Sequence, residues 1–74
     1  MSGEGIMEYT SGDVYSGSWL KGLRNGKGQY VWAVGPRYTG NWLDDVILGR
    51  GILRDRSSVK NVDFIDGRFV PVQN

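Results

Sequence analysis

The chain has 74 residues, a formal net charge of +1, twelve glycines and nine aromatic residues, and neither cysteine nor histidine. A chain this short forms one domain that buries only about 60% of its unfolded surface. Without Cys and His it has no disulfides, no thiolate or imidazole metal ligands, and no Ser-His or Cys-His catalysis. Residues 21–60 carry a net charge of +5, a modest basic surface that falls well short of a nucleic-acid-binding stripe. No apolar run approaches the ~18 residues of a membrane span, and no signal peptide is visible. We therefore expect a cytoplasmic protein that needs no cofactor or metal.

The first predicted element is a β-hairpin over residues 3–20, with strands at 4–9 and 15–20 around Ser11 and Gly12. Tyr15, Gly17 and Trp19 fall on alternate positions of the second strand. Alternate positions of a strand share one face of the sheet. This hairpin therefore has one face of rings and glycines.

The central hairpin, residues 26–43, has the clearest alternation in the chain, and Val34, Gly35 and Pro36 mark its turn. The residues that share its aromatic face are Gly26, Gly28, Tyr30, Trp32, Tyr38, Gly40 and Trp42. Both strands can place these residues on one face only if the loop has an odd number of residues or a bulge. A loop centred on Gly35 pairs Trp32 with Tyr38, Tyr30 with Gly40 and Gly28 with Trp42. Each interior glycine then lies opposite a ring that covers its exposed backbone.

A period of 23 residues relates the first two hairpins. Subtracting 23 takes Tyr38 to Tyr15, Gly40 to Gly17 and Trp42 to Trp19. The same shift predicts an equivalent register in the first hairpin, in which Gly5 pairs with Trp19. Internal repeats at such a period are typical of repeat proteins, in which each unit packs on its neighbours.

A third, degenerate copy follows at residues 49–66. It keeps Gly49 and Gly51, and Phe64 replaces Trp42 at a distance of 22 residues. The expected register pairs Gly51 with Phe64. Residues 67–74 are predicted to be a tail packed on this hairpin, as an edge strand or no strand, because Pro71 cannot donate a ladder hydrogen bond.

Loops are expected between the hairpins, at residues 21–25 and 44–48, and no helical period is present. The predicted fold is therefore all-β: a single-layer antiparallel sheet, or solenoid, of three consecutive hairpins, the last degenerate. The abrupt start of the repeat at Gly3 predicts that the chain is a fragment of a longer array. It also predicts self-association through the N-terminal edge.

The pattern Y-x-G-x-W-x-x-G-x-x-x-G-x-G-x-Y, from Tyr15 to Tyr30, resembles the MORN repeat (membrane occupation and recognition nexus). The next copy departs from it at Asp45, where Gly is usual, and at Leu53, where an aromatic residue is usual. The resemblance implies an elongated array of hairpins that acts as a scaffold or interaction module, beside catalytic domains or alone, without doing chemistry itself.

Three groups of residues are candidates for function or structure. The aromatic set forms the core, and some of its rings could also line a groove for a partner helix or peptide: Tyr15, Trp19, Tyr30, Trp32, Tyr38, Trp42 and Phe64. The repeat glycines serve the backbone: Gly5, Gly17, Gly26, Gly28, Gly40, Gly49 and Gly51. The basic set is either a solvated surface or a contact for anionic partners: Lys21, Arg24, Lys27, Arg37 and Arg50. No catalytic residue is predicted, because no pair of carboxylates is placed for acid–base work.

The leading functional hypothesis is a non-catalytic scaffold that binds a protein, peptide or helix. One alternative is a membrane-surface module that binds anionic phospholipids, at a membrane or near the cytoskeleton. Another is an accessory domain of an enzyme such as a phosphatidylinositol phosphate kinase.

Overall fold

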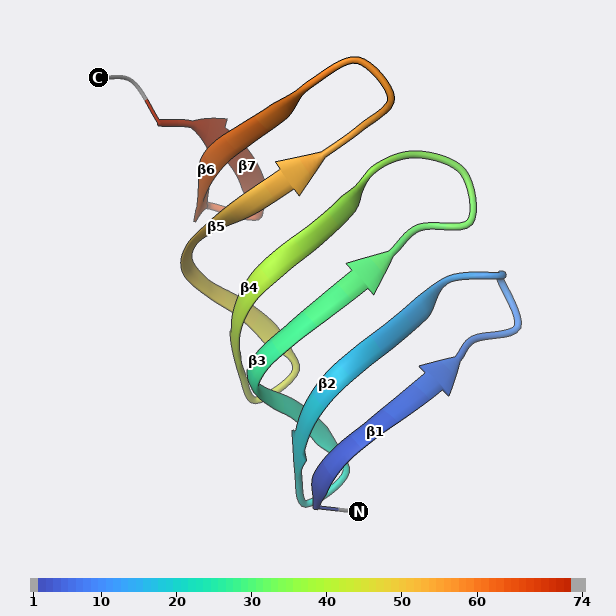
Figure 1. The fold of residues 1–74 in the computed structure, drawn as a ribbon. Coiled ribbons are helices and arrows are strands. Elements are labelled where there is room, and N and C mark those ends of the chain that lie inside the picture. Colours follow the sequence, from blue (N-terminus) through green and yellow to red (C-terminus); the bar gives the residue numbers. More distant parts are fainter. Residues whose placement is uncertain (1, 73–74) are drawn as a thin grey trace.

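The structure, a computed structural model that describes residues 2–72, is a single antiparallel sheet of seven strands in sequence order (Figure 1). The strands are β1 (Gly3–Glu8), β2 (Val14–Leu20), β3 (Leu23–Val31), β4 (Arg37–Leu43), β5 (Val46–Arg54), β6 (Val59–Ile65) and β7 (Arg68–Pro71). The sheet is elongated, with extents of 38 × 23 × 19 Å. The prediction of an all-β, single-layer array of hairpins is confirmed. Self-association through the β1 edge stays a prediction.

The connections between hairpins are two-residue turns, so the prediction of loops at residues 21–25 and 44–48 is wrong. The first turn joins Leu20 to Leu23 through Lys21 and Gly22, whose φ angles are 54° and 80°. Positive φ at both central residues is the mark of a type I′ turn, whose twist matches that of the flanking strands. Neighbouring hairpins therefore pair with each other and form one continuous sheet.

The same turn recurs twice. Asp44 and Asp45 have φ angles of 47° and 74° between β4 and β5, and Asp66 and Gly67 have φ angles of 51° and 79° between β6 and β7. The tail therefore begins as the strand β7, which pairs with β6 along the edge of the described sheet. Residues 73–74 of the expected tail lie outside the described residues.

The predicted faces agree with the structure, but the predicted register is wrong by two positions. In the central hairpin Tyr30 pairs with Tyr38, Gly28 with Gly40 and Gly26 with Trp42. The loop is centred on Val34, because the N–H of Trp32 donates to the carbonyl of Pro36 (3.3 Å). Pro36 has no N–H to donate, so its carbonyl closes the loop. The first and third hairpins show the same displacement: Trp19 pairs with Gly3, and Gly51 with Val62.

Glycine consequently lies opposite glycine, in a row that crosses four strands: Gly5, Gly17, Gly28 and Gly40. The rings still cover glycines, but they do so by lying diagonally across the sheet. A Cβ atom on Gly28 would overlap the Tyr15 ring, and a Cβ atom on Gly51 would overlap the Tyr38 ring. The missing side chains are therefore what leaves room for the two tyrosines.

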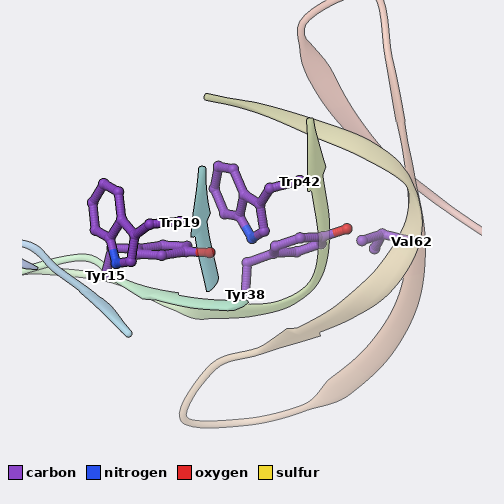
Figure 2. Close-up of a cluster of buried hydrophobic side chains, with 5 residues drawn as sticks. All are labelled: Tyr15, Trp19, Tyr38, Trp42 and Val62. Carbon is purple, nitrogen blue, oxygen red and sulfur yellow. The ribbon is translucent and has the colours of Figure 1, made fainter. Parts of the chain in front are cut away.

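Two irregularities curl the sheet into a trough. Between the pairs Gly17–Gly28 and Trp19–Arg24, two steps along β2 face four along β3, so β3 carries two extra residues. The register of β4 and β5 shifts in the same way after Thr39. Extra residues on one strand bend it and increase its twist. The strands accordingly curve around the aromatic side chains (Figures 1 and 2).

Candidate functional site

The inner face of the trough is built from one unit used twice, a tyrosine lying flat on the sheet with a tryptophan standing over it (Figure 2). The pairs are Tyr15 with Trp19, at 5.0 Å between ring centroids, and Tyr38 with Trp42, at 6.1 Å, both edge to face. Trp42 also meets the edge of Tyr15, at 5.4 Å. These four side chains are at most 6% exposed and form the core with Val62. Their first role is to hold neighbouring hairpins together.

Each tryptophan is also held by a hydrogen bond across the hairpin. Nε1–H of Trp19 donates to the carbonyl of Gly5 (3.2 Å), and that of Trp42 to the carbonyl of Gly28 (3.3 Å). A buried indole N–H needs such an acceptor. The repeat glycines thus serve the core with their backbone as well as with their lack of a side chain.

Four of the five other aromatic side chains, all of them only partly buried, lie in a row beside this core. Tyr30 packs on Trp32 at 4.9 Å, Trp32 on Phe69 at 6.0 Å, and Phe69 on Phe64 at 5.3 Å. The cleft that they border has a volume of about 380 Å³. It is lined by Arg24, Tyr30, Trp32, Trp42, Asp45, Val46, Ile47, Phe64, Gly67 and Phe69. We call this cleft the aromatic groove.

The two charged residues of the aromatic groove are paired with each other. Nε of Arg24 donates to Oδ1 of Asp45 (2.7 Å), and Nη2 of Arg24 donates to the backbone carbonyl of Asp45 (3.0 Å). The guanidinium carbon lies 4.8 Å from the Trp42 ring centre and 5.4 Å from that of Tyr30, within cation–π range. Although burial opposes it, hydrogen bonding to Arg24 lowers the pKa of Asp45. Arg24 thereby joins two hairpins, and its contact with an anionic partner stays a prediction.

A second polar link ties adjacent hairpin loops together. The Tyr30 hydroxyl donates to Oδ2 of Asp13 (2.8 Å), and the Ala33 N–H donates to Oδ1 of Asp13 (2.8 Å). Desolvation, followed by the bond to Asp13, raises the pKa of Tyr30 to about 12. The bond from Ala33 and then that from Tyr30 lower the pKa of Asp13. Tyr30 is thereby fixed at the rim of the aromatic groove.

The structure does not gather the remaining basic residues. Lys21 lies in a turn, and Lys27 lies on the outer face, where it pairs with Asn41. Arg50 binds Asp63 (Nε to Oδ1, 3.0 Å). Arg37 lies near the hairpin loops, where it pairs with Arg54. The predicted basic set is therefore spread over several parts of the sheet.

Six residues of the core or of the groove lining were not among the predicted site residues: Asp45, Val46, Ile47, Val62, Gly67 and Phe69. Phe69 was assigned to the tail, yet it packs on Tyr38 at 5.1 Å. The sequence does contain a signal for it: Asp66-Gly67, between Ile65 and Arg68, is a typical type I′ turn dipeptide and predicts a further strand. Val62 also has a signal, because it alternates with Phe64 and so shares the face of that ring, whereas Ile47 falls in a stretch expected to be a loop.

Among residues 2–72, no group of three or more carboxylates is placed to hold a metal ion. The same stretch contains no helix with the length and apolarity needed to cross a membrane.

The hairpins form one curled sheet, and a Tyr–Trp unit recurs in it after 23 residues. The protein is therefore an all-β repeat protein built from consecutive hairpins. The model of the MORN repeat family matches this chain in three segments, at residues 1–14, 15–37 and 38–58. The chain therefore belongs to the MORN repeat family, a non-catalytic repeat module. A comparison with curated proteins finds no match. Residues 59–72 lie outside the matched segments but continue the sheet as β6 and β7.

Proposed function

We propose that this chain is a protein-interaction module whose aromatic groove binds an apolar segment of a partner protein, most simply one face of an amphipathic helix. The observation that carries the proposal is the row of partly exposed rings: Tyr30, Trp32, Phe64 and Phe69. Aromatic residues are enriched among the anchors of protein interfaces. A helix laid in a groove presents apolar side chains at i, i+3, i+4 and i+7.

Charge complementarity also favours an apolar partner over a charged one. Arg24 and Asp45, the charged residues of the groove lining, already satisfy each other. An incoming charged side chain would have to break that pair or lose its own hydration without compensation. Apolar side chains incur neither cost.

The test uses peptides selected from a displayed random library against the intact chain, with affinities measured by fluorescence polarisation. We expect selected peptides with helical apolar spacing. Replacing Trp32→Ala or Phe64→Ala should weaken their binding about tenfold or more. The matched control is Ile6→Ala, because Ile6 is a large apolar residue that is 70% exposed on β1, far along the sheet from the groove. Circular dichroism melts show whether each variant folds.

The proposal fails if the folded Trp32→Ala and Phe64→Ala proteins bind the peptides as tightly as the original chain does. It also fails if Ile6→Ala weakens binding equally, since the peptides would then bind elsewhere. The membrane alternative predicts salt-sensitive sedimentation with phosphatidylserine vesicles. The engagement of Arg24 and Arg50 with carboxylates gives that alternative less support.

A further inference from the structure

Two arginines lie directly opposite each other on the outer face of the sheet. Arg37 on β4 and Arg54 on β5 are cross-strand partners, next to the pair formed by Tyr38 and Leu53. Because Tyr38 is fully buried on the inner face, its neighbour Arg37 points outward, and both arginines are exposed. Like charges directly opposite each other destabilise a sheet. Their arrangement therefore calls for a compensating negative charge.

That charge is not supplied by the described part of the chain. Within residues 2–72 the ion pairs are Arg24–Asp45 and Arg50–Asp63. Arg37 and Arg54 take part in neither pair. The nearby carboxylate, Asp55, is turned into its own loop. Its Oδ1 accepts hydrogen bonds from the N–H groups of Ser57 and Ser58, both at 2.8 Å. The N–H bond from Ser57 is the largest cause of its lowered pKa.

Two hollows flank the arginine pair. One, of about 380 Å³, lies toward the loops and is lined by Gly35, Arg37, Arg54, Asp55 and Arg56. The other, of about 260 Å³, lies along the strands and is lined by Gln29, Arg37, Thr39, Ile52 and Arg54. The second adds a hydroxyl and an amide to the two guanidinium groups. Both hollows share Arg37 and Arg54, but the Asp55 carboxylate, which repels an anion, also lines the loop-side hollow. The strand-side hollow, with Gln29 and Thr39, is therefore the better place for an anion bound by the two arginines.

We propose that Arg37 and Arg54 form a binding site for a phosphate monoester on the outer face, opposite the aromatic groove and independent of it. Guanidinium forks match phosphate oxygens and bind them in a bidentate manner. Two adjacent positive charges are matched by one group with two negative charges. A phosphate monoester becomes such a dianion when its second proton leaves near pH ~6, whereas a carboxylate or a phosphodiester has one charge.

The primary experiment titrates the labelled chain with inorganic phosphate at constant ionic strength and follows the arginine Nε–H signals by NMR. We expect saturable shifts at Arg37 and Arg54, and weaker binding when the pH falls below the second pKa of inorganic phosphate, because the dianion then takes up a proton. Arg37→Gln and Arg54→Gln should each weaken binding about tenfold, the loss of one charge-assisted contact. Arg68→Gln is the matched control, since it removes the same charge from β7, and it should change the affinity less than about twofold.

A second experiment measures melting temperatures, first without phosphate and then with it. Without phosphate, Arg37→Gln should melt at a higher temperature than the original chain, because it removes the repulsion between opposed charges. Added phosphate should raise the melting temperature of the original chain and have little effect on that variant.

Vesicles distinguish the two sources of a phosphate monoester. Phosphatidylcholine vesicles that contain phosphatidic acid present a phosphate monoester at a membrane surface. Vesicles that contain phosphatidylserine, at the same total lipid charge, present a phosphodiester. Sedimentation with the first, dependent on Arg37 and Arg54, identifies a lipid headgroup. Binding of inorganic phosphate without such sedimentation identifies a soluble phosphate. The proposal is overturned if phosphate gives no saturable shift, if Arg68→Gln weakens binding as much as Arg37→Gln, or if the affinity is the same above and below the second pKa of inorganic phosphate.

Discussion

Tyr15 and Tyr38 occupy the same place in successive repeats, yet their hydroxyl groups meet different surroundings. The Tyr15 hydroxyl donates to the carbonyl of Ser18 (3.0 Å). The Tyr38 hydroxyl is buried and has no hydrogen-bond partner among residues 2–72, and it points toward Val62 (Figure 2). The side chain at the end of the Tyr38 ring is the aliphatic Val62, which belongs to the degenerate third repeat.

Removing the two hydroxyl groups should therefore have opposite effects. Tyr15→Phe should lower the free energy of unfolding by about 1 kcal/mol, the value of an ordinary hydrogen bond. Tyr38→Phe should leave it unchanged or raise it by up to about 1 kcal/mol, because an unsatisfied buried hydroxyl is lost. Urea denaturation of both variants measures the difference. Equal destabilisation by the two substitutions would show that Tyr38 has a hydrogen-bond partner in solution.

At the scale of elements, the turn between β4 and β5 combines strain and a specific contact. Asp44 and Asp45 both have positive φ, which is costly for residues with a side chain. Asp45 offsets this cost with its bonds to Arg24, whose N–H and Nε both donate to Oδ1. The Asp44 side chain has no hydrogen bond or ion pair among the contacts of residues 2–72.

Glycine substitutions separate these two contributions. Asp44→Gly should raise the free energy of unfolding by about 0.5 kcal/mol, because glycine adopts positive φ without strain. Asp45→Gly should relieve the same strain but lower stability by about 1–3 kcal/mol overall, because it leaves the half-buried Arg24 unpaired. Thermal melts monitored by circular dichroism compare the variants. If Asp45→Gly proves the more stable of the two, the pair with Arg24 contributes little.

At the scale of the whole molecule, titratable groups that link neighbouring hairpins set the pH range of the fold. Burial is the largest cause that raises the pKa values of Tyr15 and Tyr38 above 10.0, and that of Tyr30 rises to about 12. The pKa of Asp13 is lowered below 3.8 by its bonds from Ala33 and Tyr30. Deprotonation of these tyrosines at high pH and protonation of Asp13 at low pH therefore both disrupt contacts between hairpins.

Stability should accordingly fall on either side of a broad plateau. A raised tyrosine pKa means that the unfolded chain loses its proton first, so stability is lost as the pH rises from 10.0 toward about 12. A lowered aspartate pKa means that the unfolded chain takes up its proton first, so stability is lost as the pH falls below 3.8. Urea midpoints across this range give the measurement, and Tyr30→Phe should flatten the alkaline limb. An alkaline limb equally steep in Tyr30→Phe would contradict this assignment.

The sequence by itself determined the class of fold and four of the five core residues. Alternation of rings and glycines at a period of 23 residues is enough to identify stacked hairpins and to place Tyr15, Trp19, Tyr38 and Trp42 on one face, because the direction of a side chain in a strand is a local property. The turn dipeptide Asp66-Gly67 also contained the information for β7, although Pro71 suggested otherwise.

Only the tertiary structure decided the strand register, the position of the aromatic groove and the contacts of the basic residues. Register depends on which hydrogen bond closes each loop, and displacements by two positions keep every side chain on the same face, so alternation cannot distinguish them. Arg24 and Asp45 are 21 positions apart, and they meet because β3 pairs with β4 and the two-residue turn after β4 places Asp45 beside Arg24. Arg37 and Arg54 likewise become neighbours only through strand pairing, since contacts between distant residues follow from the path of the chain and not from local pattern.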